Sequence, residues 1–267
     1  MKKSKKLFVL LAVVAILTVS VFSFAACTPN DSVLTVYTNA GFAPFEFMHG
    51  NEVIGVDVEI GKVIAKKLGK KVEVKSIDFD AITEAVKNKP NSSVGIAGMT
   101  IKEIDGIVFS NAYFTSQQYI LAKKGTITAV DGEAGIAALN NKKIGVQLST
   151  TGHDLITKSI DNGSLTASAP TTNKDLNVLY TMLDAGSIDA LVLDKLPVES
   201  FLSKNPDGLE VIKISGVEVE SYGVAVAEGQ DALLKVVNEV LEEKKEQILT
   251  WVTSYNDLYK NLSSSEK

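Results

Sequence analysis

The sequence predicts an α/β fold built around mostly parallel sheets, and three observations support that prediction. Short apolar, β-branched runs alternate along the chain with segments in which apolar residues recur at helical spacing. Such alternation is typical of parallel sheets that helices cover on both faces. The chain also has 267 residues, 45% of them hydrophobic, which is enough for one large domain or for two lobes.

The expected strands are short and mostly apolar. In the second of them, Val72 and Val74 alternate with lysine and glutamate, as in a half-buried strand. The run before Asp194 is fully apolar, which favours a strand buried on both faces. In order, the expected strands cover residues 33–38, 71–76, 94–99, 119–123, 143–147, 189–193, 209–214 and 222–227.

The expected helices lie between these strands. In the first, Val56, Ile60, Val63, Ile64 and Leu68 share one face. The last is a long amphipathic region whose pattern leaves open a break near its middle. The expected helices cover residues 54–68, 80–87, 151–159, 174–185 and 231–255.

The composition argues against several classes of protein. One cysteine and two distant histidines, His49 and His153, do not provide a disulfide framework or a familiar metal-binding pattern, so we expect no metal and no cofactor. All 27 basic residues are lysines, and the chain has no arginine. Together with a net charge of −5, this argues against nucleic-acid binding, in which arginine usually forms bidentate hydrogen bonds with phosphate and guanine.

The first residues are typical of an export signal. Four lysines within residues 1–6 precede an apolar run over residues 7–26, which is also long enough to span a bilayer uncut. The segment Phe24-Ala25-Ala26-Cys27 resembles a bacterial lipobox, although Phe24 departs from the usual aliphatic residue. We therefore predict a signal peptide over residues 1–26, a lipid on Cys27 that anchors the protein to the cell membrane, and a tether over residues 27–32. The mature chain would have 23 lysines against 32 acidic residues.

Six segments, taken together and in order, resemble one known family. They are residues 41–47 (Gly-Phe-Ala-Pro-Phe-Glu-Phe), 54–60, 97–101, 145–152, 189–194 and 222–226. This set is similar to the bacterial extracellular solute-binding proteins of family 3, the receptors of polar amino-acid ABC importers. The similarity covers about residues 33–260.

The resemblance implies a two-lobed clamshell of the periplasmic-binding-protein type II, with a mostly parallel sheet in each lobe and two hinge strands between the lobes. It places residues 33–116 and 215–267 in the first lobe and residues 117–214 in the second. The implied function is binding of a small polar solute in the interlobe cleft, without catalysis, by a monomer that delivers the solute to an ABC permease. Two other functions stay open: a dehydratase-like enzyme on the same scaffold, and a ligand-sensing or interaction lipoprotein.

The resemblance also assigns ligand-binding positions. Phe42 and Phe79 match aromatic residues that pack on the ligand, and Asp194 matches the carboxylate that receives its ammonium group. The remaining positions are Gly98, Thr100, Ser149, Thr150 and Thr151. The last three follow a strand and precede a helix, where backbone N–H groups favour an anion, but Ser and Thr there are also ordinary helix caps. Asp57 fits a cap or an internal ion pair better than a ligand contact.

One family feature is missing. Members normally have an arginine a few residues after the Met-Thr-Ile stretch, where it binds the carboxylate of the ligand. That spacing leads here to Asp105, and Lys102 offers only a point charge. Three explanations follow: the ligand is a cationic or neutral solute, the helix terminus at Ser149 holds a carboxylate alone, or the original ligand has been lost. A pocket that held both Asp105 and Asp194 would be electronegative and prefer a cation; the alternative is that Asp105 points outward.

Overall fold

The computed structural model describes residues 32–204 and 206–262. The described residues from Val33 onward belong to one compact unit. The predicted signal peptide, Cys27 and nearly all of the tether lie outside the described residues. None of the helices described is both long enough and apolar enough to cross a membrane.

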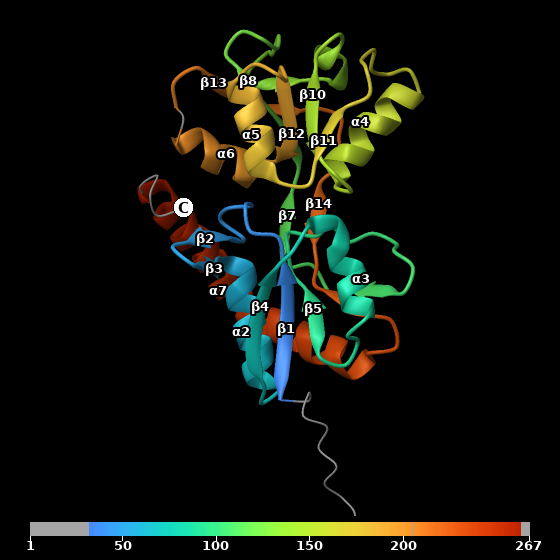
Figure 1. Cartoon of the computed structure of the whole chain (residues 1–267), viewed down its shortest axis with the longest axis vertical. Coiled ribbons are helices and arrows are strands. Elements are labelled where there is room, and N and C mark those ends of the chain that lie inside the picture. Colours follow the sequence, from blue (N-terminus) through green and yellow to red (C-terminus); the bar gives the residue numbers. More distant parts are fainter. Residues whose placement is uncertain (1–31, 205, 263–267) are drawn as a thin grey trace, which may run out of the picture. The chain divides into compact units, whose positions relative to one another are not determined.

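The first lobe is built on a five-stranded sheet (Figure 1). Its strands, in spatial order, are β4 (Lys71–Ser76), β1 (Val33–Thr38), β5 (Ser93–Gly95), β15 (Ala225–Ala227) and β6 (Ile107–Phe109). β1 pairs in parallel with β4 and β5, and β15 is antiparallel to both of its neighbours. The sheet therefore contains a strand from near the end of the chain between two strands from its first half.

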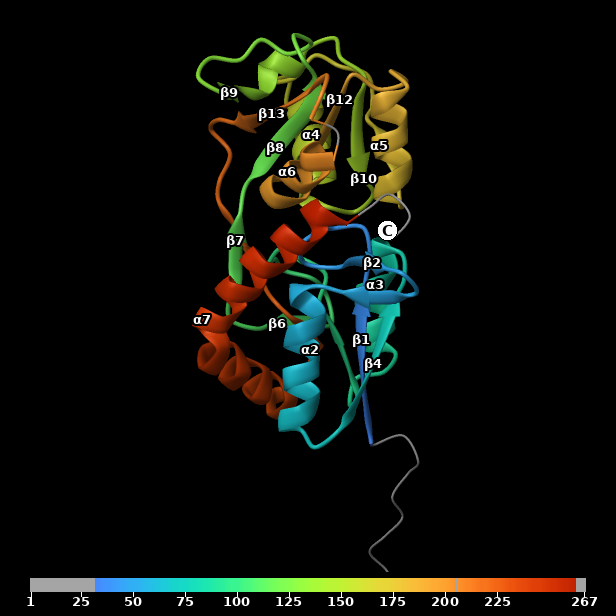
Figure 2. The ribbon, with the colours of Figure 1, turned by 90° about the vertical axis from the view of Figure 1, so that its left-hand side faces the viewer.

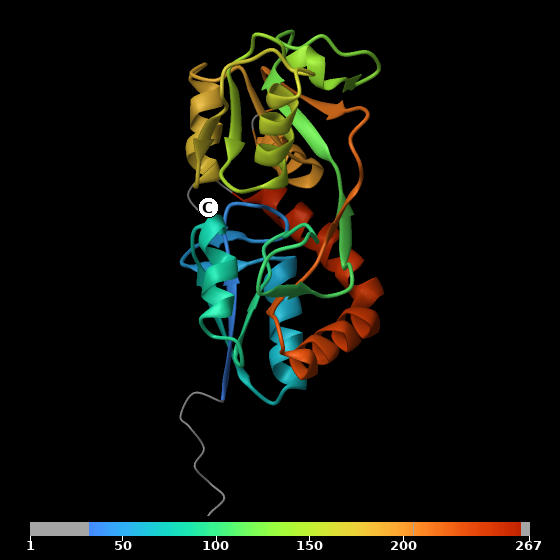
Figure 3. The ribbon, with the colours of Figure 1, turned by 90° about the vertical axis from the view of Figure 1, so that its right-hand side faces the viewer.

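Helices cover both faces of this sheet. α2 (Val56–Lys67) and the long α7 (Asp231–Asn261) pack together on one face, and α3 (Ile82–Lys87) lies on the other (Figures 2 and 3). Gly61 of α2 lies so close to β1 that an added Cβ would come within 2.6 Å of the Val36 side chain. α7 is amphipathic, with Leu233, Val237 and Val240 among its buried residues. Helix–sheet packing thus forms the core beneath the pocket.

The second lobe is built on a six-stranded sheet. Its strands, in spatial order, are β11 (Thr171–Asn173), β10 (Ile144–Gln147), β12 (Ala190–Asp194), β8 (Gln118–Lys123), β13 (Leu209–Ile214) and β9 (Glu133–Ala134). α4 (Thr151–Asp161) packs on one face through Ile156, which clusters with Ile120 and Val192. α5 (Leu176–Asp184) and α6 (Lys195–Lys204) contribute to the core on the opposite face. β10 and β12 are parallel, so Gln147 and Asp194 come to the same edge of the sheet.

A two-stranded ribbon joins the lobes. β7 (Phe114–Ser116) leads into the second sheet, and β14 (Glu220–Tyr222) leads back from it, with Ser116 opposite Glu220. The remaining elements are the hairpin β2 (Phe47–His49) and β3 (Glu52–Ile54) and the 3₁₀ turns η1 (Phe79–Ala81) and η2 (Ile136–Leu139). The predicted α/β fold with two sheet-containing lobes is confirmed, and the lobe boundaries given above stay predictions.

Several predicted elements differ in the structure. The strand expected over residues 94–99 ends at Gly95, and the strand expected over residues 222–227 is two strands, β14 and β15, in different sheets. Between the two strands, the Gly223 N–H donates to the Met99 carbonyl (2.9 Å), and an added Cβ at Gly223 would lie 2.7 Å from Ile101 Cγ1. α7 is continuous and extends to Asn261, beyond the predicted end.

Candidate functional site

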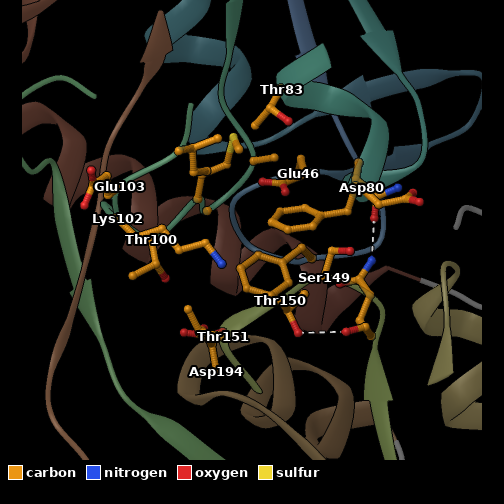
Figure 4. Close-up of a pocket in the computed structure, with 18 residues that line it drawn as sticks. Glu46, Asp80, Thr83, Thr100, Lys102, Glu103, Ser149, Thr150, Thr151 and Asp194 are labelled. Carbon is orange, nitrogen blue, oxygen red and sulfur yellow. Dashed lines mark hydrogen bonds between the residues drawn. The ribbon is translucent and has the colours of Figure 1, made fainter. Parts of the chain in front are cut away.

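A cavity of about 410 Å³ lies between the two lobes (Figure 4). All eight predicted ligand-binding residues line it: Phe42, Phe79, Gly98, Thr100, Ser149, Thr150, Thr151 and Asp194. Residues from the first lobe form one wall, and residues from β10, α4 and β12 form the other. The structure thus brings together residues that the sequence separates by about 150 positions.

In the first lobe, Phe42 packs directly on the backbone of Gly98. Gly98 has φ of 53°, and an added Cβ would lie 2.6 Å from the Phe42 ring, so only glycine leaves the ring in place. Phe42 also contacts the Tyr222 ring, with 6.3 Å between centroids. Phe79 begins the turn η1 and is the second aromatic side chain in the lining. These rings give part of the pocket lining an apolar surface.

A pair of buried carboxyl groups, Glu46 and Asp57, lies behind Phe42. Asp57 accepts hydrogen bonds from the Gly98 N–H (2.8 Å) and the Tyr113 hydroxyl (3.0 Å). Burial raises the pKa of Asp57 to about 6. Burial, and then the charge of Asp57, raises the pKa of Glu46 well above its ordinary value. Glu46 is therefore the member of the pair that binds a proton more strongly, and it lines the pocket with Oε2 buried and without a hydrogen-bond partner among the described residues.

Among the residues that the structure describes, Asp57 neither caps a helix nor forms an ion pair, contrary to the prediction for this residue. The residue that caps α2 is Gly55, two positions earlier. Asp57 is instead fully buried, where it holds the Gly98 backbone and the Tyr113 hydroxyl by the hydrogen bonds described above. Its role is to position the backbone of the pocket wall.

The start of α4 forms the opposite wall. Thr150 is the N-cap: its hydroxyl accepts from the His153 N–H (3.3 Å) and donates to the Gln147 carbonyl (2.8 Å). The helix-cap interpretation therefore applies to Thr150, whose hydroxyl is occupied although it lines the pocket. Ser149 has φ of 65°, in the left-handed region, and turns the chain from β10 into α4.

Asp194 ends β12 at the base of the second-lobe wall. It is 6% exposed and accepts hydrogen bonds from the Tyr222 hydroxyl (2.7 Å) and Gln118 Nε2 (3.2 Å). Burial, and then the nearby charge of Glu220, raises the pKa of Asp194 to about 6. A buried carboxylate without a cationic partner is well placed to bind a cation.

The segment that usually carries the arginine has a different arrangement. Asp105 is exposed and does not line the pocket, which is the outward placement that the sequence left open, so it adds no charge to the lining. Lys102, Glu103 and Ile104 line the pocket instead. The Lys102 ammonium pairs with Asp154 of α4 at 3.1 Å, so its charge is partly compensated by the second lobe.

Further polar contacts cross the pocket rim. Lys174 of the second lobe pairs with Asp80 (2.9 Å) and Asp78 (3.2 Å) of the first. Gln147 donates a hydrogen bond to Asn39 at 2.9 Å. These contacts hold the two walls in register around the cavity.

Several residues at this site have no clear signal in the sequence. Glu46 lies within the motif at residues 41–47, but a single acid among apolar residues does not show that it is buried. Asp80 and Glu103 lie on the lining with no motif of their own. Glu220 and Gln118 contact pocket residues from the ribbon and from β8, and their proximity depends on the tertiary fold alone.

Two lobes, each an α/β sheet, with a polar cavity between them define the type II periplasmic binding fold. The structure of the amino-acid ABC transporter substrate-binding protein AbpA from Streptococcus pneumoniae, bound to L-arginine, has this fold, with a TM-score of 0.76 and 23% identity over 86% of this chain and 97% of that one. The chain belongs to the bacterial extracellular solute-binding proteins, family 3, whose model matches residues 34–250.

Relatives with higher identity are named for amino acids. The arginine-binding extracellular protein ArtP of Bacillus subtilis is 29% identical over 258 residues, which cover 90% of this chain and 93% of ArtP. An ancestral arginine-binding protein, solved with bound arginine, is 33% identical, with a TM-score of 0.71 over 86% of this chain and 98% of that one. The family membership makes this chain a solute-binding protein, as the sequence predicted.

Proposed function

We propose that the chain is the extracytoplasmic receptor of an ABC importer for a small solute that carries a cationic group, such as a basic amino acid or a related amine. The observation that carries this proposal is the composition of the pocket wall. Besides Glu46, whose pKa is raised well above its ordinary value by burial, three acidic side chains (Asp80, Glu103 and Asp194) and a single lysine line it, together with two phenylalanines. Such a wall suits a positively charged group on a short apolar stem.

The pocket offers two kinds of contact to such a solute. Aromatic faces attract a cation by about 0.5–2 kcal/mol, depending on how far the cation is removed from water, and Phe42 and Phe79 provide them. Buried Asp194 provides a charge-assisted hydrogen bond. The unpartnered Oε2 of Glu46 provides a further acceptor. The solute would thus meet acceptors at both ends of the cavity.

The relatives support the same class of solute. ArtP is named for arginine, and the ancestral protein was solved with arginine bound. The chain has no arginine that could bind a solute carboxylate. Loss of a charged partner in a closed site costs about 2–5 kcal/mol. A solute whose binding depends on its cationic groups avoids that cost.

A thermal-shift screen tests the proposal. The mature chain, unfolded and refolded to remove carried-over solute, is mixed with L-arginine, L-lysine, agmatine, cadaverine, L-glutamine or L-glutamate, each at about 1 mM. At least one of the four cationic compounds should raise Tm by several degrees, as expected for a micromolar Kd. Stabilisation by glutamate but by no cationic compound would overturn the proposal.

We further propose that binding takes place without catalysis. The family is one of solute-binding proteins. Recovery of the stabilising solute unchanged after prolonged incubation, measured by mass spectrometry, is the expected result. Appearance of a product in proportion to protein concentration would favour a dehydratase-like enzyme instead.

The proposed location is the outer surface of the cell membrane, through a lipid on Cys27. The protein would act there as a monomer that delivers solute to a permease. In a Cys27→Ser variant the chain should leave the membrane fraction while it still binds solute. Retention of that variant in the membrane would indicate that the apolar run over residues 7–26 stays uncut as the anchor.

A further inference from the structure

Glu220 lies directly behind the end of the pocket that contains Thr100, Thr151 and Asp194. It belongs to β14, in the ribbon between the lobes. Its Oε2 atom is 2.6 Å from the Thr100 hydroxyl and 2.7 Å from the Thr151 hydroxyl. One carboxylate thus contacts both pocket walls, because Thr100 belongs to the first lobe and Thr151 begins α4.

These contacts fix the direction of the two hydroxyl groups. An ionised carboxylate has no hydrogen to donate, so each threonine must donate its single hydroxyl hydrogen to Glu220. Gln118 Nε2 donates to Thr151 Oγ1 (3.2 Å) and to Glu220 Oε1 (3.2 Å). The hydroxyls of Thr100 and Thr151 therefore have only lone pairs left for a solute.

The same end of the pocket holds a second carboxylate, Asp194. Gln118 Nε2 lies 3.2 Å from one oxygen of each carboxylate and from Thr151 Oγ1, so its two hydrogens are shared among three acceptors that include Asp194 and Glu220. Across the described part of the chain, no lysine forms an ion pair with either carboxylate. The nearest lysines along the chain and in the lining are paired elsewhere: Lys102 with Asp154 and Lys195 with Glu199.

On the basis of the function proposed above, we infer that this end of the pocket binds an ammonium group that has no carboxylate beside it, and that Glu220 determines this preference. An ammonium group donates three hydrogen bonds. Asp194, Thr100 and Thr151 offer it three acceptors. The solute class is then a primary amine with a second cationic or polar end.

The α-carboxylate of an amino acid would be disfavoured at this position. It lies one carbon from the ammonium nitrogen, so it would approach Glu220 and Asp194 while the threonine hydroxyls have no hydrogen to offer it. The start of α4 attracts negative charge, but Asp194 and Glu220 already provide it there. Like charges in a cleft of low dielectric repel strongly.

Matched solutes test the inference directly on the wild-type protein. Agmatine differs from L-arginine, and cadaverine from L-lysine, only by loss of the α-carboxylate. Calorimetric titration of the refolded mature chain should give a Kd at least about tenfold lower for the amine of at least one pair. A lower Kd for the amino acid in both pairs would overturn the inference and leave the proposed function intact. Failure of all four compounds to bind would overturn both.

A variant tests whether Glu220 determines the preference for an amine over the matching amino acid. Glu220→Gln keeps the size of the side chain but removes its charge and adds a donor, which frees a threonine hydroxyl to donate. The ratio of amine to amino-acid affinity should fall by about tenfold or more. The matched control is Glu218→Gln, two residues earlier on an exposed position, which should leave the ratio unchanged.

The ratio of amine affinity to amino-acid affinity distinguishes an effect of Glu220 on specificity from a purely structural role. General damage to the pocket would weaken the amine and the amino acid alike and leave their ratio as it is in the wild type. An unchanged ratio in a folded Glu220→Gln protein would show that Glu220 does not determine the preference. If this variant does not fold, the comparison of matched solutes on the wild-type protein still decides whether the carboxylate is disfavoured.

Discussion

Asp194 is a buried carboxylate whose position and orientation suit the binding of a positively charged group. Its hydrogen bonds from Tyr222 and Gln118 fix its orientation, while burial raises its pKa to about 6. Without a solute, its charge is costly because water is largely excluded. A bound cation removes that cost, so the residue contributes to affinity more than to the stability of the unliganded protein.

We therefore predict opposite effects of Asp194→Asn on binding and on stability. Affinity for the cationic solute should fall by about 100-fold or more, since a buried charge pair loses one member. The Tm of the unliganded protein should stay the same or rise, because an amide is cheaper to bury. Calorimetry and thermal denaturation measure the two effects, with the exposed Asp184→Asn as control. A marked loss of unliganded stability would contradict this account.

A second prediction about a single residue concerns Gly98. In Gly98→Ala the added methyl group would meet both positive φ and the Phe42 ring. Gly69 has a similar φ of 66° but nothing near its Cβ position, which makes Gly69→Ala a matched control for backbone strain alone. We expect Gly69→Ala to lower the free energy of unfolding by about 1 kcal/mol and Gly98→Ala by about 2–4 kcal/mol.

Binding distinguishes the two glycine variants further. Displacement of Phe42 should weaken solute binding in Gly98→Ala, whereas Gly69→Ala should bind as the wild type does. Equal losses of stability and affinity in the two variants would show that contact with Phe42 is unimportant. Urea denaturation and calorimetry give the required comparison.

Among the elements, α4 connects a helix cap to the pocket wall. Thr150 caps this helix through the His153 N–H. Thr150→Ala should lower the free energy of unfolding by about 1 kcal/mol, and Thr150→Ser should restore most of it. Because the Thr150 hydroxyl is occupied by the cap, affinity should change by less than about threefold. A loss of affinity that exceeds the loss of stability would instead assign Thr150 a direct solute contact.

The long elements could be predicted from the sequence, and the short ones could not. β1, β4 and β13 match the expected ranges because six residues are enough to show an apolar or alternating pattern. β6, β7 and β14 have three residues each, too few for any period. α6 was missed because Pro197 and the apolar residues near it conceal its periodicity.

The pocket residues show the same limit of prediction from local sequence patterns. The eight residues predicted from the family resemblance meet in one cavity because they lie at the end of a strand, at the start of a helical turn, or in the loops that follow β1, β5 and β10. Glu46, Gln118 and Glu220 matter through burial and through partners distant in sequence. Burial and long-range contacts belong to the folded chain and have no local signature.

At the scale of the whole molecule, buried carboxyl groups should make stability depend on pH in an unusual direction. Burial raises the pKa of Glu46, Asp57 and Asp194. A group whose pKa is higher in the folded state binds more protons when folded, so the free energy of unfolding falls as pH rises between the two pKa values. For Asp57 and Asp194 that window runs from 3.8 to about 6.

The unliganded protein should therefore be more stable at about pH 5 than at about pH 7, by roughly 1–3 kcal/mol per carboxyl group. Exposed groups with lowered pKa, such as Glu84, oppose this trend weakly. Urea denaturation at both pH values measures it. Affinity for a cationic solute should change in the opposite direction and be higher at about pH 7 than at about pH 5, because Asp194 must lose its proton to bind a cation. Higher stability at neutral pH would contradict the assigned pKa shifts.

The position of β15 also affects the order in which the protein can form. An exported chain emerges from its amino end, and the strands of the second sheet all lie within residues 118–214. The first sheet cannot close until residues 225–227 have arrived to fill the space between β5 and β6. During translocation the second lobe can therefore fold while the first still lacks a central strand, and the pocket is completed only when the last part of the chain has crossed the membrane.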